Sequence, residues 1–214
     1  MNRQNKKEAV AALHREQIMV AAEKLFSEKG FSQTTIDDIS KASEYSRRTI
    51  YSYYESKEDI LHHIIEKGLF VLKKEIEKSI KATDVFIDQY KGICLSISRY
   101  QSEYSHSANN VNNALSKNLD HDNLSDTVKH ILLLGAEINN LLEGFIENGK
   151  KNGIVRQDVV PMLTVYVLWS SIDALLVLVQ KKGYFISKQF SISEHDFLDY
   201  GFRQIINSIL EERI

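Results

Sequence analysis

Residues 34–61 limit the fold most, because three helix starts follow one another closely in this segment. Thr35 followed by Asp38 has the form of a capping box, with Asp in the place of the usual Glu or Gln. Ser46 can cap a second helix through its hydroxyl oxygen, and Ser56 can open a third helix. The segment is therefore predicted to consist of short helices separated by tight turns.

The first two of these helix starts delimit a helix-turn-helix motif. The apolar residues of the first helix recur at helical spacing and are Ile36, Ile39 and Ala42. Residues 43–45 leave room only for a tight turn. A short helix, such a turn and a second short helix together make the helix-turn-helix arrangement.

The second short helix is predicted to present side chains that suit DNA. Ile50 and Tyr54 lie four residues apart and are expected to face the core. Arginine can bond guanine O6 and N7 in a bidentate way, and threonine or tyrosine can reach phosphates or bases. The residues that we expect to contact DNA are Thr35, Ser46, Arg47, Arg48, Thr49, Tyr51, Tyr53 and Lys57.

These residues divide by their expected role. The group assigned to base edges and nearby phosphates is Arg47, Arg48, Thr49 and Tyr51. The group assigned to phosphates is Thr35, Tyr53 and Lys57. Lys57 lies in the first turn of the third helix, where free N–H groups and the helix dipole already favour an anion. It is therefore predicted to clamp a phosphate.

At these positions the sequence resembles the tetracycline-repressor (TetR) family of bacterial regulators. The matching residues are Gly30-Phe31, Thr34-Thr35, Ile39-Ser40, Ser43-Glu44-Tyr45-Ser46, Thr49-Ile50-Tyr51, Tyr53-Tyr54 and Ser56-Lys57-Glu58. Their order and spacing hold without a gap. Glu44 departs from the pattern, because the family commonly has Gly there and the turn can need a positive φ. We expect Glu44 either to adopt that conformation at some cost or to change the turn slightly.

The resemblance implies an all-α chain with two domains. Residues 1–56 would form a three-helix DNA-binding head, and residues 57–214 a helical effector-binding and dimerisation domain. It also implies repression by binding to a palindromic operator in double-stranded DNA, relieved when an effector occupies the second domain. A Gly-x-x-Arg-x-Asp link at residues 153–158 is common in the family as well.

The composition is compatible with a helical, cytoplasmic protein. One Pro and nine Gly provide few helix breakers, and apolar residues make up 43% of the chain. The formal net charge of −2 means that DNA binding must use a local basic patch. The one cysteine, Cys94, excludes a disulfide within one chain and fits a reducing cytoplasm. The sequence has no apolar leader typical of secretion, and the apolar run at residues 162–179 is predicted to be a buried helix rather than a membrane span.

Hydrophobic periodicity predicts further helices along the chain. They cover residues 11–29, 56–81, 84–104, 127–151, 162–182 and 193–214. Residues 1–8 are either a frayed terminus or a basic arm that touches DNA, and the Asn-rich residues 105–125 are a polar connection that could contain a short helix. Asp158 is expected to cap the penultimate helix, with Pro161 in its first turn, and Ser193 with Asp196 to cap the last.

The last two helices carry more apolar surface than a single surface layer needs. They form either the core of the monomer or a symmetric four-helix interface in a homodimer. We favour the dimer, because two heads on a two-fold axis can grip successive major grooves about 34–36 Å apart.

The middle helices combine apolar stripes with scattered polar groups. These groups are Tyr90, Cys94, Tyr104, Glu137, Asn140, Tyr166, Trp169 and Asp173. Each alone fits a satisfied core or surface position. Together, on helices that follow a DNA-binding head, they predict a cavity for a small, largely apolar effector.

Other functions have less support in the sequence. His62 and His63 are adjacent and point about 100° apart on a helix, so no metal site is expected, and no cofactor is predicted. The chain has no Gly-x-Ser-x-Gly motif and no phosphate-binding or dinucleotide-binding glycine loop, which argues against an enzyme. A helical regulator whose second domain binds a protein instead of a small molecule stays open as the alternative.

Overall fold

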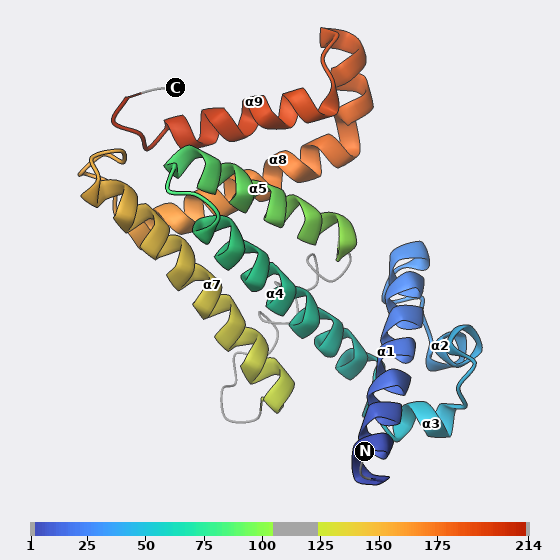
Figure 1. Cartoon of the computed structure of the whole chain (residues 1–214). Coiled ribbons are helices and arrows are strands. Elements are labelled where there is room, and N and C mark those ends of the chain that lie inside the picture. Colours follow the sequence, from blue (N-terminus) through green and yellow to red (C-terminus); the bar gives the residue numbers. More distant parts are fainter. Residues whose placement is uncertain (1–2, 105–123, 213–214) are drawn as a thin grey trace. The chain divides into compact units, whose positions relative to one another are not determined.

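The computed structural model describes residues 3–104 and 124–212. These residues form eight helices and no strand, which confirms the all-α fold (Figure 1). The helices are α1 (Arg3–Lys29), α2 (Ile36–Ser43), α3 (Arg47–Tyr51), α4 (Lys57–Lys81), α5 (Phe86–Glu103), α7 (Asp126–Lys151), α8 (Pro161–Phe190) and α9 (Glu194–Asn207). The short helix predicted within residues 105–125 falls almost entirely outside the described residues.

The chain forms two compact units. The first comprises residues 1–70 and 102–133, and the second residues 71–101 and 134–214. The helix α4 therefore begins in the first unit and ends in the second. The domain boundary at residue 56 that the sequence suggests stays a prediction.

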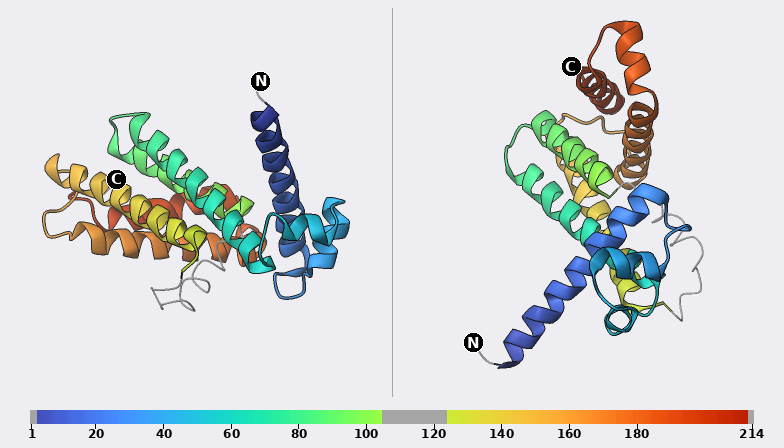
Figure 2. Two further views of the ribbon diagram at one scale, coloured as in Figure 1. Left: turned by 90° about the horizontal axis from the view of Figure 1, so that it is seen from below. Right: turned by 90° about the vertical axis from the view of Figure 1, so that its right-hand side faces the viewer.

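The first unit contains a three-helix head in which α2 and α3 lie beside α1 (Figure 2). Its core side chains are Ile18, Ala22, Phe26, Ile39, Ile50 and Tyr54, all nearly inaccessible to solvent. Burial of each large apolar side chain stabilises the head by about 1.5–3 kcal/mol. Phe31 covers one edge of this core, its ring 5.1 Å from that of Phe26. The hydroxyl of Tyr54 donates to the carbonyl of Arg15, at 3.1 Å, so the buried phenol is satisfied.

The second unit is built around α5, α7, α8 and α9. In Figure 2, α8 and α9 run side by side as an antiparallel pair, and they are in extensive contact. The pair packs closely because Gly201 of α9 faces Leu175 of α8, where a Cβ would collide with the leucine side chain. Stacked rings of Phe86 and Phe145, 4.3 Å apart, join α5 to α7.

Several helix ends differ from the prediction. The helix α1 begins at Arg3, so most of the segment predicted to be a frayed terminus or a basic arm is helical. This segment contains good helix formers and no Pro or Gly to stop the helix. The helix α8 continues beyond residue 182 to Phe190, because Gly183 lies buried against Glu194 inside the helix instead of ending it.

The start of α8 and the end of α9 also correct the prediction. Asp158 does not cap α8: the cap position is Val160, without a side-chain bond, while the Asp158 carboxylate accepts from Arg156 at 3.2 Å. Pro161 occupies the first turn as expected. The helix α9 ends at Asn207 instead of reaching the C-terminus, because the following residues pair with the loop before α8 through an isolated bridge between Val155 and Leu210.

The helix α8 is long and apolar enough to cross a membrane by length and composition, a test that core helices of soluble proteins also pass. In the most apolar 18-residue stretch of α8, only 28% of the stretch is buried within the chain. The predicted buried helix is therefore only partly correct, since one face of α8 is open.

Candidate nucleic-acid interface and effector cavity

Side-chain caps set the direction of the two helices of the helix-turn-helix. The Thr35 hydroxyl accepts from the backbone N–H of Asp38 at 3.2 Å, and the Asp38 carboxylate accepts from the backbone N–H of Thr35 at 2.9 Å, which confirms the capping box. The ammonium group of Lys29 binds the same carboxylate at 2.6 Å. The hydrogen bonds from Lys29 and Thr35 hold the pKa of Asp38 well below its usual range.

The turn between α2 and α3 has the backbone of a glycine turn without a glycine. Glu44 adopts the left-handed conformation, with φ of 61° and ψ of 16°. This outcome matches the first of the two expectations for Glu44. Such a conformation costs a residue with a Cβ about 1–2 kcal/mol. The turn is therefore formed in the usual way, and α3 keeps its direction at the expense of some stability.

The helix α3 has one buried side and one exposed side. Ser46 caps it by accepting from the N–H of Thr49 at 3.1 Å, and the hydroxyls of Ser46 and Thr49 lie 2.9 Å apart. Ile50 is fully buried, while Arg47 and Arg48 are exposed. Tyr51, with 55% of its surface accessible, is exposed as well. The structure thus places all four residues assigned to base edges on one short helix.

Tyr53 and Lys57, which follow α3 and are assigned to phosphates, have hydrogen-bond partners inside the head. The ammonium group of Lys57 donates to the backbone carbonyls of Phe31 and Thr34, each at 2.8 Å, and lies 4.2 Å from the centre of the Phe31 ring. Tyr53 is bound through its hydroxyl to Nδ1 of His14, at 3.0 Å. Sequence reasoning missed these contacts, since their partners lie far away along the chain. The assignment of both residues to phosphates stays a prediction.

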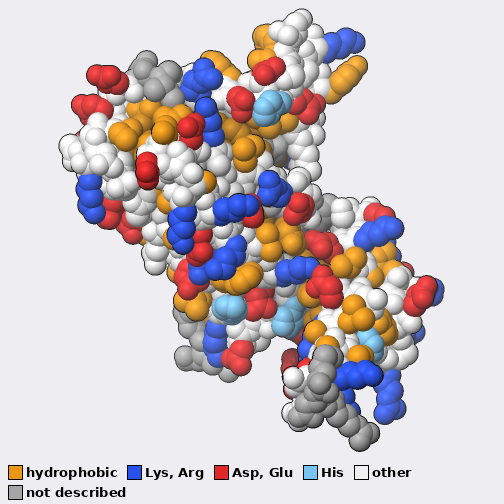
Figure 3. All heavy atoms as spheres, in the orientation of Figure 1, with side chains coloured by type: hydrophobic (Ala, Val, Ile, Leu, Met, Phe, Trp, Pro, Cys, Tyr) orange, Lys and Arg blue, Asp and Glu red, His pale blue; other side chains and the backbone are white. Residues whose placement is uncertain are grey.

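No broad basic surface surrounds the motif on the face drawn in Figure 3, where basic and acidic side chains are interspersed. This mixture fits the net charge of −2. Positive charge for DNA must therefore come from a few side chains at α3 and around it.

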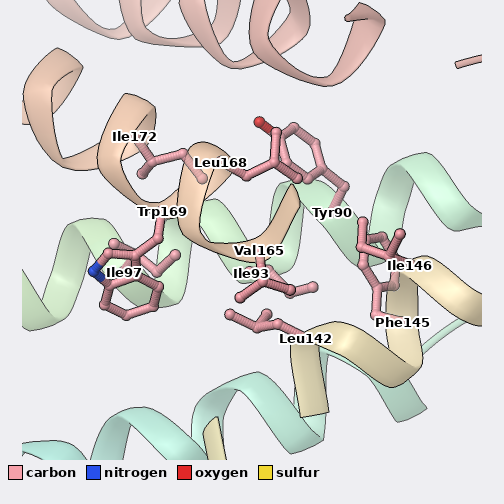
Figure 4. Close-up of a pocket in the computed structure, with 10 residues that line it drawn as sticks. All are labelled: Tyr90, Ile93, Ile97, Leu142, Phe145, Ile146, Val165, Leu168, Trp169 and Ile172. Carbon is pink, nitrogen blue, oxygen red and sulfur yellow. The ribbon is translucent and has the colours of Figure 1, made fainter. Parts of the chain in front are cut away.

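A separate site lies between α5, α7 and α8 in the second unit. Its cavity of about 20 Å³ is lined by Tyr90, Ile93, Ile97, Leu142, Phe145, Ile146, Val165, Leu168, Trp169 and Ile172 (Figure 4). This volume is close to that of one water molecule. The lining side chains are nearly all apolar, so the cavity provides few polar partners.

Only two of the eight residues predicted for the effector site line this cavity, namely Tyr90 and Trp169. The Tyr90 hydroxyl donates to the carbonyl of Phe202 at 3.0 Å. Cys94 is buried beside it, and burial raises the pKa of its thiol to about 12, so the thiol is protonated at neutral pH.

The other five predicted residues lie away from the cavity. Tyr104 belongs to the first compact unit, and Asn140 and Tyr166 are exposed. Glu137 forms an ion pair with Lys73 at 2.8 Å, and Asp173 accepts from Gln101. The polar residues are thus dispersed, and the lining of the cavity comes instead from the apolar stripes of α5, α7 and α8.

The exposed face of α8 is a long apolar stripe. Its apolar members include Leu163, Tyr166, Val167, Leu178 and Phe185, and all of these except Leu178 have more than half of their surface accessible. They recur at helical spacing on the side opposite the buried residues of α8. The chain leaves this stripe uncovered among the described residues.

Among the described residues no group of three or more His, Cys, Asp or Glu side chains is placed to hold a metal ion. His63 instead contacts Asp59 and Glu66 on its own helix, α4. Cys94 is buried inside α5, and burial keeps its thiol protonated at neutral pH, so it is a poor nucleophile.

Comparison with known proteins places the head in a family. The model of the tetR family of bacterial regulatory proteins matches residues 18–64, which include α2, α3 and the start of α4. The uncharacterized HTH-type transcriptional regulator YfiR of Bacillus subtilis is 31% identical over 99 residues, which are 46% of this chain and 44% of that protein. The chain spans less than half the length of several of the curated relatives that it matches.

Solved structures extend the likeness of the fold to the second unit. The TetR family transcriptional regulator PfmR from Thermus thermophilus has a TM-score of 0.69 at 20% identity and covers 88% of this chain and 96% of its own. The regulator FadR from Bacillus subtilis, solved with stearoyl-CoA, has a TM-score of 0.66 at 18% identity and covers 91% of this chain and 98% of its own. The helix-turn-helix is therefore that of the tetR family of bacterial regulatory proteins, and the chain shares its overall fold with a TetR family transcriptional regulator.

Proposed function

We propose that the protein is a sequence-specific DNA-binding transcriptional regulator that reads the major groove with α3. The observation that carries this proposal is the division of α3 into a buried and an exposed side. Ile50 anchors the helix in the core, and Arg47 and Arg48 extend from its N-terminal turn. Arginine at this end of a recognition helix can reach guanine edges, while the hydroxyls nearby can bind phosphates.

The proposed regulator acts as a homodimer through α8 and α9. The exposed stripe on α8 supports this arrangement, because an apolar face of this length on a soluble protein favours burial against a partner. A symmetric pairing would bury the same stripe on both subunits. It would also provide two heads for the two halves of a palindromic operator.

The proposed regulator represses transcription and leaves its operator when an apolar effector enters the cavity lined by Tyr90 and Trp169. The lining supports a ligand with a hydrocarbon chain, and the related FadR of Bacillus subtilis was solved with stearoyl-CoA. The cavity of about 20 Å³ cannot hold such a chain, so the effector would stabilise a conformer with α5, α7 and α8 further apart. Since α4 belongs to both compact units, it is the element through which that change would reach the head.

Selection of DNA fragments from a random pool by the full-length protein tests the proposal. A regulator of this kind enriches a palindromic sequence, and the release of that duplex on addition of stearoyl-CoA measures the effector response. A control with a short-chain acyl-CoA separates the contribution of the hydrocarbon chain from that of the nucleotide. Recovery of fragments without a shared sequence would overturn the proposal.

The small size of the cavity also favours a second candidate, in which the second unit binds another protein. In that case α8 or α9 would take the partner on its surface, and no apolar small molecule would enter the protein. The melting temperature distinguishes the two candidates. A rise on addition of acyl-CoA supports the small effector, because a ligand that binds the native state stabilises it.

A further inference from the structure

His14 of α1 lies between two tyrosines that flank α3 in the sequence. Its Nδ1 is 3.0 Å from the hydroxyl oxygen of Tyr53, which follows α3. Its ring lies 4.9 Å from the ring of Tyr45, which precedes α3, and 5.9 Å from the ring of Tyr53. The imidazole therefore touches both ends of the segment that contains α3, although it lies nearly 40 residues away from Tyr53 along the chain.

The groups recorded around His14 are uncharged or basic. Besides the two phenols, the neighbouring groups are the side chain of Gln17, which accepts from the Tyr45 hydroxyl, and the guanidinium of Arg15, which lies 5.4 Å from the centre of the Tyr53 ring. No carboxylate forms an ion pair with His14 among the residues that the structure describes. An anion that approaches from outside, such as a DNA phosphate, would therefore be the group that favours the charged imidazole.

The proton on His14 determines what the Tyr53 hydroxyl can donate to. When Nδ1 is unprotonated it accepts the phenol proton, and the one donor of Tyr53 is used inside the head. When Nδ1 carries a proton, as it always does in the imidazolium and also does in the neutral Nδ1–H tautomer, it donates to the phenol oxygen, and the phenol proton can point outward. A phosphate oxygen only accepts hydrogen bonds, so Tyr53 can serve it only in the second arrangement.

We propose that His14 is a positioning residue that makes DNA binding depend on pH, because its protonation releases the Tyr53 hydroxyl for a phosphate. The inference rests on the DNA binding proposed above. The phosphate stabilises the imidazolium, so DNA binding takes up a proton at His14. Affinity is then greater in acid than in alkaline solution.

The test is fluorescence anisotropy with a labelled duplex of mixed sequence, since a phosphate contact acts on any sequence. The dissociation constant is measured at constant ionic strength from about pH 5.5 to about pH 8, across the titration of an ordinary histidine. Wild-type protein should gain about fivefold more affinity over this range than His14→Gln, which keeps a neutral hydrogen-bonding side chain. Tyr53→Phe should lose the same fivefold gain in affinity at low pH. The double variant should lose no more of this gain than either single variant.

A matched control accounts for the other titrating groups of the protein. His195→Gln removes an exposed histidine of α9 in the second unit and should keep the wild-type pH dependence. Parallel pH curves for wild type and His14→Gln would overturn the role of His14 while leaving the proposed DNA binding intact. Absence of binding to any duplex at any pH would overturn both. If His14→Gln unfolds, the pH dependence of affinity in Tyr53→Phe tests the proposal alone, since this variant retains the ring and removes only the hydroxyl. A pH dependence equal to that of wild type would then overturn the proposal.

Discussion

The carboxylate of Asp37 on α2 forms an ion pair with Nε of Arg47, the first residue of α3. A contact through Nε leaves the two terminal nitrogens of the guanidinium available. These are the atoms that bond guanine O6 and N7. The pair thus links the first helix of the motif to a side chain of the second that is assigned to base recognition.

Replacement of Arg47 should therefore affect specificity more than general affinity. Arg47→Ala is expected to cost ~1–3 kcal/mol of binding to the selected operator and to relax the preference at one base position. Arg47→Lys keeps the charge but cannot make the bidentate contact, so it should recover salt-dependent binding without the base preference. Competition with operators changed at single positions measures both effects. An unchanged base preference in Arg47→Ala would contradict the assignment.

Replacement of Lys57 should act on the fold as well as on DNA. Lys57→Ala leaves the carbonyls of Phe31 and Thr34 without their ammonium donor, so the head should lose about 1–3 kcal/mol of stability. If Lys57 also binds a phosphate, the slope of log affinity against log salt falls by about one unit, equally for all sequences. Thermal unfolding and a salt titration measure the two effects separately. A changed melting temperature with an unchanged slope would limit Lys57 to a structural role.

Glu44→Gly should stabilise the protein, because glycine adopts the observed φ of 61° without the cost that a Cβ imposes. We expect a gain of about 0.5–1 kcal/mol, since part of the conformational benefit is offset by the greater entropy of unfolded glycine. Glu44→Ala removes the same charge and keeps the Cβ. It should therefore show no gain, and denaturant unfolding of the two variants separates backbone strain from charge.

The pH dependence of stability should report the capping box. The pKa of Asp38 is lowered in the folded state, so the stability that it contributes is complete above the ordinary carboxyl pKa of about 3.9 and is lost as the pH falls below that value. Asp38→Asn should be less stable than wild type at neutral pH, and the difference should shrink in acid. Melting temperatures at about pH 7 and about pH 3 measure this. A difference that does not change with pH would contradict the assignment.

The exposed stripe on α8 can be tested with a matched pair of substitutions. Val167 and Val85 have 63% and 56% of their surface accessible, but only Val167 lies on α8. Val167→Lys should weaken the dimer by more than about tenfold, because it places a charge inside an apolar interface. Val85→Lys should leave the dimer intact, and sedimentation equilibrium distinguishes the two. A dimer equally stable in both variants would exclude this face of α8 as the interface.

The parts of the fold that depend on neighbouring residues could be predicted from the sequence. The capping box of Thr35 and Asp38 and the cap at Ser193 follow from side chains within one helical turn of each other, and the structure confirms both. The position of Glu44 in a tight turn leaves two outcomes for its backbone, and the structure has the left-handed one.

Contacts between distant residues could not be predicted in this way. Lys57 binds carbonyls 23 and 26 residues earlier, and Asp173 accepts from Gln101, 72 residues away. Periodicity shows which side of a helix is apolar but not which stripes meet. For this reason the sequence identifies the lining residues only as apolar stripes, and it does not show that polar residues such as Asn140 lie away from the cavity.

The measurement that tests the central proposal most directly is the affinity of the full-length protein for the selected palindromic duplex and for a scrambled duplex, across a salt series. We predict tight binding to the palindrome, weak binding to the scrambled sequence, and an affinity that falls linearly on a logarithmic scale with salt as phosphate contacts are screened. Equal and weak binding to both duplexes at every salt concentration would contradict the assignment of α3 as a recognition helix.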